Sequence, residues 1–163
     1  MVISKVLNKM IYYFGDDVKR INHALKVYGY AKAISGNEQI SDKHRVVVEL
    51  AAILHDIGIK EAERKYNSSA GKYQEMEGPA IAVELIPSDE IEETIIKRVC
   101  HLIGNHHSYQ KIDGMDFQIL VEADFLVNIE EEKLETEVIK SIKEKYFKTS
   151  TGQKILESLY GIV

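Results

Sequence analysis

The chain has 163 residues and a net charge of −5, with 45% hydrophobic and 29% charged residues. This composition excludes a disordered chain, and no stretch approaches the ~20 apolar residues of a membrane helix. The negative charge excludes a general attraction to nucleic acid, although it leaves room for a local basic pocket. Cys100 is alone, so no internal disulfide can form, and we expect a cytoplasmic protein.

Hydrophobic spacing predicts helices from the start of the chain. Residues 1–14 are amphipathic, and two lysines interrupt the apolar run that a signal peptide would need. Residues 19–34 repeat apolar side chains at helical intervals, and Asp16 or Asp17 can cap this helix.

The next predicted helix is apolar on every side, which is typical of a helix buried all round. Ser41 caps it, and it runs to about Ile57, with Gly58 as its stop. Residues 46–48 are three valines and allow a strand as an alternative, but their neighbours favour the helix.

A polar segment at residues 61–72 predicts a loop, with room for one short helix. Pro79 fits the first turn of the following helix, which ends near Ile86. Ser88 can cap another helix that runs towards His106.

The rest of the chain continues this pattern. Residues 108–114 predict a loop, residues 117–128 a helix, and residues 130–163 one or two surface helices. We therefore predict an all-α fold: one helical domain over residues 1–163, with its core at about 16–128.

Two acidic residues interrupt apolar helices. His55 and Asp56 lie in the most apolar segment, and Asp124 has mostly apolar neighbours three and four residues away. A buried carboxylate is costly unless it is paired or binds a metal. The alternatives are a His–Asp pair that closes a helix end, and a salt bridge for Asp124.

Three histidines add nitrogen ligands. His106 and His107 follow a long helix, and both can reach one centre only where that helix ends or bends. His23 lies at the edge of an apolar stripe. The alternatives are solvated surface histidines for the pair and a hydrogen-bonded core histidine for His23.

Taken together, these side chains predict a metal site. Imidazole and carboxylate suit divalent metals, and the chain has no set of thiolates for structural zinc. The set is large enough for one metal with open positions, or for two metals that share a carboxylate.

The same residues resemble the HD-domain metal-dependent phosphohydrolase superfamily, over about residues 16–128. The matching segments are Arg20–His23, Leu50–Gly58, Glu77–Ala82, His106–His107 with Ile112–Gly114, and Val121–Asp124.

The resemblance implies a set of metal ligands. The first metal would be held by His23, His55, Asp56 and Asp124. Asp56 would bridge to a second, weaker site at His106 and His107. Gln74 stands where the binuclear branches have another histidine, so Glu75 or Glu77 is expected to supply an oxygen, and we assign Glu77 to this second site.

The resemblance also implies roles in catalysis. Asp56 would orient the attacking water if only one metal binds, and Lys60 and Arg20 are candidates to hold a phosphate. Solvated surface charge is the alternative for each of these two cations.

The resulting hypothesis is a metal-dependent phosphohydrolase that cleaves a phosphate ester or anhydride of a nucleotide with a metal-activated water. The cofactor would be divalent Fe, Mn, Ni, Co, Mg or Zn, and the partner a small phosphorylated substrate, with neither a membrane nor nucleic acid. A non-catalytic nucleotide-sensing module and a di-iron oxygenase are the alternatives.

Overall fold

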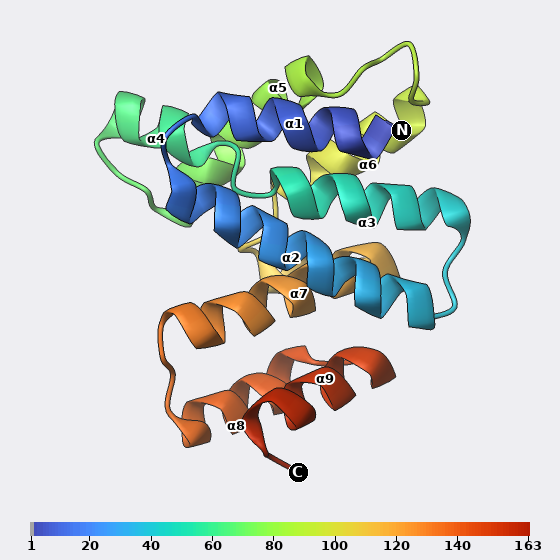
Figure 1. Ribbon diagram of the computed structural model, residues 1–163, viewed down its shortest axis with the longest axis vertical. Coiled ribbons are helices and arrows are strands. Elements are labelled where there is room, and N and C mark those ends of the chain that lie inside the picture. The colour runs from blue at the N-terminus through green and yellow to red at the C-terminus, as the bar shows by residue number, and fades with distance from the viewer. Residues whose placement is uncertain (1) are drawn as a thin grey trace.

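The computed structural model describes residues 2–163, which form nine α-helices and one short 3-10 helix, with no strand in that range (Figure 1). The all-α prediction is confirmed. The helices are α1 (Val2–Phe14), α2 (Val18–Asn37), α3 (Asp42–Leu54), α4 (Ile59–Tyr66), α5 (Gly71–Leu85), α6 (Glu93–Ile103), η1 (Tyr109–Lys111), α7 (Met115–Glu131), α8 (Thr136–Tyr146) and α9 (Ser150–Tyr160).

Helix α3 lies at the centre of the bundle, in contact with α1, α2, α6 and α7. This explains its apolar sequence: seven of its residues are buried, among them the run from Leu50 to Leu54. Ser41 caps the helix, as predicted, and its hydroxyl accepts a hydrogen bond from the backbone N–H of His44 at 3.2 Å.

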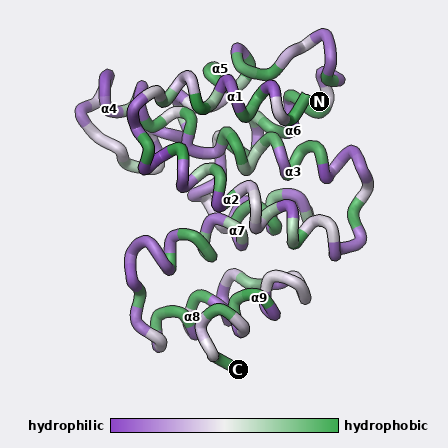
Figure 2. Tube along the Cα trace, viewed as in Figure 1, coloured by the Kyte–Doolittle hydropathy of each residue, from purple (hydrophilic) through white to green (hydrophobic). Residues whose placement is uncertain are grey.

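Helices α1 and α2 are amphipathic, and hydropathy alternates along both in Figure 2. Helix α1 buries Val6, Met10 and Phe14, which are spaced four residues apart on one face. Met1, part of the predicted first helix, lies outside the described residues. Asp17 is the N-cap of α2, and its carboxylate accepts from the backbone N–H of Arg20.

The connection after α3 differs from the prediction. The helix ends at Leu54, and Gly58 is the residue before α4 rather than the stop of α3. Helix α4 is the short helix for which the predicted loop left room, and it begins at Ile59. It forms because Ala62 is buried and Arg64 pairs with Glu61 at 2.6 Å, one turn apart on the exposed side.

Two predicted helix starts were wrong. Pro79 lies inside α5, which begins at Gly71, and the close packing of α6 against this part of α5 outweighs the hydrogen bond that proline removes. Ser88 lies in a turn, and α6 begins after Glu92. Ser88 to Glu90 are exposed, and the buried Ile91 anchors this turn to the core before α6 starts.

The C-terminal helices α8 and α9 lie at the end of the long axis away from α1 (Figure 1). The buried side chains Phe147 and Leu156 attach them to the core. Glu122 on α7 also holds their junction, because its carboxylate accepts hydrogen bonds from the backbone N–H groups of Lys148 and Thr149 at 2.6 and 2.9 Å.

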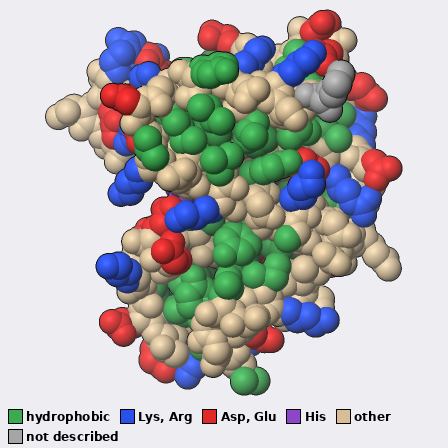
Figure 3. Space-filling view, in the orientation of Figure 1, with side chains coloured by type: hydrophobic (Ala, Val, Ile, Leu, Met, Phe, Trp, Pro, Cys, Tyr) green, Lys and Arg blue, Asp and Glu red, His purple; other side chains and the backbone are tan. Residues whose placement is uncertain are grey.

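The face in Figure 3 shows hydrophobic side chains in two areas, one above and one below a zone that contains charged side chains. None of the described helices combines the length and apolar character that a bilayer-spanning helix needs.

Candidate metal centre

Three helices bring four predicted ligands together. His23 comes from α2, His55 and Asp56 from the turn directly after α3, and Asp124 from the middle of α7. The Nε2 atom of His23 lies 3.1 Å from Nε2 of His55 and 3.2 Å from Oδ1 of Asp124. Asp124 Oδ1 is also 3.6 Å from Nε2 of His55. The four side chains therefore converge on one small space.

The other ring nitrogens fix the tautomers of these histidines. Nδ1 of His23 lies 3.0 Å from a carboxylate oxygen of Glu131, and Nδ1 of His55 lies 2.8 Å from the carbonyl oxygen of Ala52. Both partners are acceptors, so each Nδ1 carries the donated proton. Each Nε2 is then left with a lone pair that points at the shared space, which is how metal-binding histidines are commonly held.

Asp56 faces two groups of histidines with its two oxygens. Its Oδ2 lies 3.4 Å from Nε2 of both His23 and His55, and its Oδ1 lies 3.3 Å from Nε2 of His106. Among the described residues, His23, His55 and Asp56 form one group with metal-ligand spacing, and Asp56, His106 and His107 form another. A carboxylate shared in this way suits a two-metal site.

The His106 ring is buried and lacks one partner. Its Nδ1 donates to the carbonyl oxygen of Ile103 at 2.8 Å, while its Nε2 has no hydrogen-bond partner among the described residues. Although Asp56 Oδ1 is close, the contact does not have hydrogen-bond geometry. An unpartnered buried nitrogen is costly, and a cation at this position would satisfy it.

His107 is held by α5. Its backbone N–H donates to the Glu75 carboxylate at 3.0 Å, and its Nε2 lies 3.4 Å from the amide oxygen of Gln74. Burial, with the neighbouring His106, lowers the pKa of His107 to about 4, so the ring is neutral near pH 7 and available as a ligand.

The electrostatics of the first group also fit a cation. Burial raises the pKa of Asp56, but His55 and His106 lower it by more. The resulting pKa lies well below the usual range. Burial also raises the pKa of Asp124, but His23 and His55 lower it by more, so this pKa is lowered as well. Both carboxylates are therefore ionised, and the donor set fits one or two divalent metals.

Glycines allow α5 to pack closely against the His55–Asp56 turn and the His107 ring. A Cβ atom on Gly58 would lie 2.6 Å from the backbone nitrogen of Gly78, and one on Gly71 would lie 2.7 Å from the ring of His107. Side chains at these positions would push α5 away from the His55–Asp56 turn or displace His107.

Two predicted site residues are directed elsewhere. Glu77 was assigned to the second metal site, but its two oxygens bind Tyr66 Oη and Lys65 Nζ, each at 2.8 Å. Lys60 was a candidate phosphate ligand, but its ammonium donates to the carbonyl oxygen of Tyr13 and lies over the Tyr13 ring. In both cases a neighbouring helix offers a nearer partner.

Arg20 lies beside the centre, together with Lys19. Both line a cavity of about 460 Å³ that also reaches His23 and Asp56. The guanidinium is already engaged, because it pairs with Asp17 at 3.0 Å and with Glu63 at 2.5 Å.

Sequence reasoning missed Glu131 and Asn128, which orient ligands, and considered Glu75 only as an oxygen ligand. Glu131 holds the ring of His23, Asn128 donates to Asp124 at 3.0 Å, and Glu75 holds the His107 backbone. Asn128 and Glu131 lie four and seven residues after Asp124, so helical spacing places them on the same face and could have identified them.

Comparisons with known proteins agree with this geometry. The family model described as HD domain matches residues 20–149. A solved structure described as a predicted HD superfamily hydrolase from an uncultured Thermotogales bacterium is similar, with a TM-score of 0.69 and 23% identity. The match covers 97% of this chain and 84% of that one. No curated protein matches. The chain belongs to the HD domain family.

Proposed function

We propose that this protein is a metal-dependent phosphohydrolase that removes phosphate from a nucleotide. The observation that carries the proposal is the shared Asp56 carboxylate, which faces His23 and His55 with one oxygen and His106 with the other. Membership of the HD family and the likeness to a predicted HD hydrolase support the general part of this proposal, a metal-dependent hydrolase.

The residues present fit one or two divalent ions at His23, His55, Asp56, Asp124, His106 and His107. Such ions supply positive charge for a phosphoryl oxygen and lower the pKa of a bound water. The protein's own part is to hold the ligand atoms in place. Glu131 and the Ala52 carbonyl orient the rings of His23 and His55, and Asn128 orients Asp124.

The cavity beside the centre favours a substrate with a short phosphate group. Lys19 provides positive charge, since Arg20 is already paired, but Asp17, Glu131 and Glu132 line the same cavity. A triphosphate would extend towards these carboxylates, and like charges repel. We therefore expect nucleoside monophosphates to be cleaved faster than triphosphates.

The test is phosphate release from a panel of nucleoside mono-, di- and triphosphates with protein loaded with Mn²⁺. Chelation should abolish release, and His55→Ala should lower it by at least about 100-fold because a ligand is lost. His101→Ala is the matched control, because His101 is an exposed histidine that pairs with Asp113 on the surface, and it should retain activity. Metal-independent release, or full activity in His55→Ala, would contradict the proposal.

A further inference from the structure

A second cavity lies between η1 and the end of α8 and has a volume of about 520 Å³. Its lining includes Tyr109, Gln118, Lys145, Tyr146 and Lys148, and none of the metal-centre residues. We call it the η1–α8 pocket. It contains two lysines and no carboxylate, in a chain with 26 acidic and 21 basic residues. Such a local basic pocket is compatible with the negative net charge of the whole chain.

The two lysines of this pocket form no ion pairs with carboxylates of the described residues. Lys145 forms no ion pair among the described residues, and the Lys148 ammonium donates only to the backbone carbonyl of Glu144, at 2.9 Å. Both are exposed, so their ammonium groups remain available to an anion. Ammonium groups bind phosphate oxygens through charge-assisted hydrogen bonds.

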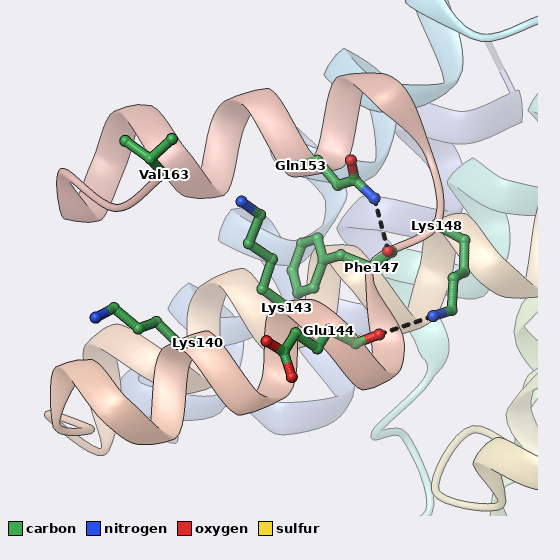
Figure 4. Close-up of a pocket in the computed structure, with 7 residues that line it drawn as sticks. All are labelled: Lys140, Lys143, Glu144, Phe147, Lys148, Gln153 and Val163. Carbon is green, nitrogen blue, oxygen red and sulfur yellow. Dashed lines mark hydrogen bonds between the residues drawn. The ribbon is translucent and has the colours of Figure 1, made fainter.

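The neighbouring cavity between α8 and α9 shows the contrast (Figure 4). Lys140, Lys143 and Lys148 surround it, with a volume of about 330 Å³. There Lys143 pairs with Glu157 at 2.7 Å, and Lys140 pairs with Glu137 at 3.1 Å. Lys148 lines both cavities, so the unpaired lysine that is found only in the η1–α8 pocket is Lys145.

Aromatic rings form one wall of the η1–α8 pocket. The rings of Tyr109 and Tyr146 lie 4.8 Å apart, and Tyr146 stacks on Phe125 at 4.9 Å with an angle of 17°. These contacts hold the rings in place, so a flat ligand would meet a preorganised surface.

We propose that the η1–α8 pocket binds a nucleotide, with its phosphates at Lys145 and Lys148 and its base against Tyr109 and Tyr146. Aromatic stacking with nearby cations is a common way to hold a nucleotide base and its phosphate. This goes beyond the proposed reaction, because none of the residues that line the pocket is a candidate metal ligand. It adds a non-catalytic site on the side of α7 that carries Phe125, the residue after Asp124.

The test is titration of ¹⁵N-labelled protein with ADP in the presence of a chelator, which keeps hydrolysis out of the measurement. We expect the amide signals of Tyr109 and of residues 145–148 to shift in a saturable way. The double variant Lys145→Gln, Lys148→Gln should lower the affinity at least 10-fold. The matched control is Lys140→Gln, Lys154→Gln, which removes the same charge elsewhere on the C-terminal helices and should bind ADP as the wild type does.

Two further ligands separate the parts of the site. Adenosine and pyrophosphate should each bind more weakly than ADP, because each reaches only the rings or only the lysines. If pyrophosphate bound as tightly as ADP, the rings of Tyr109 and Tyr146 would contribute nothing to the affinity, and the proposed base contact would be wrong. Shifts confined to the amides around Asp124, or wild-type affinity in the Lys145, Lys148 variant, would overturn the proposal. Because no turnover is measured, these outcomes are independent of the proposed hydrolase activity.

Discussion

The Nε2 atoms of His23 and His55 lie 3.1 Å apart, and both rings donate their Nδ1 protons in other directions. Two nitrogen lone pairs therefore face each other across one hydrogen-bond length. This arrangement is unfavourable without a positive charge between them, and Asp56 and Asp124 add negative charge to the same space. In the apoprotein a proton can supply this positive charge, and a divalent metal would supply it while binding all four ligands.

The number of metal ions bound is the first prediction. We expect two equivalents of Mn²⁺ per chain at saturating metal, and one in the variant His106→Ala, which removes a ligand from the second group only. Glu77→Ala should keep both, because its carboxylate binds Lys65 and Tyr66. Elemental analysis after equilibrium dialysis measures this. Two equivalents in His106→Ala would show that this ring is not a ligand.

The second prediction concerns the residue that orients His23. Glu131→Ala should weaken metal binding by about 10- to 100-fold, because the ring loses the acceptor that fixes its tautomer. Glu130→Ala is the matched control: Glu130 is the preceding, exposed carboxylate and pairs only with Lys26. Titration with a competing metal indicator measures both affinities, and equal affinities would mean that Glu131 has no role in orienting the ligand.

The third prediction concerns the attachment of the C-terminal helices. Glu122→Ala should lower the free energy of unfolding by about 3 kcal/mol, because two backbone N–H groups lose a buried acceptor. Glu144→Ala, on the exposed side of α8, should change it by less than about 0.5 kcal/mol. Urea denaturation measures both. A similar small change in the two variants would show that water or other groups replace the carboxylate.

The fourth prediction is a pH dependence. Burial raises the pKa of Asp116, but Arg98, which donates to it at 2.7 and 2.8 Å, lowers the pKa to below its usual value. A lowered folded-state pKa gives stability that is present above the unfolded value of about 3.9 and is lost as the pH falls through the folded value.

Arg98→Leu should therefore cost about 2 kcal/mol near pH 7, where Asp116 is charged and buried, and less below about pH 4. Lys97→Leu is the control, because Lys97 pairs with Glu93 on the surface. Urea midpoints between pH 3 and pH 7 measure the difference. A cost for Arg98→Leu that stays constant over this range would mean that packing, rather than charge, is what Arg98 contributes.

Local sequence alone indicates that Asp56 and Asp124 need a partner, whereas their convergence with His23 and His55 was implied by the resemblance to the HD family. Asp56 and Asp124 interrupt apolar helices, and a charge at such a position needs a partner. The apolar run from Leu50 to Leu54 predicts burial, and these residues are buried. The arrangement of the helices is a long-range property, so a local pattern cannot by itself bring His23 and Asp124 to one site.

Long side chains could not be placed in the same way. Lys60 reaches the carbonyl oxygen of Tyr13, 47 residues earlier in the chain, and this partner exists only once α1 and α4 are adjacent. Glu77 is captured by Lys65 and Tyr66 on α4 for the same reason. Pro79 was misplaced because tertiary packing outweighs a local preference for the first turn of a helix.

The close approach of Gly58 to Gly78 has a consequence for engineering the centre. The distance between α5 and the turn from His55 to Gly58 is limited by main-chain contact, because a Cβ atom on Gly58 would lie 2.6 Å from the backbone nitrogen of Gly78. Substitutions among the ligands will therefore leave the distance between this turn and α5 unchanged. A different spacing would require a redesigned backbone, in which α5 is shifted as a unit and the turn from His55 to Gly58 is rebuilt to meet it.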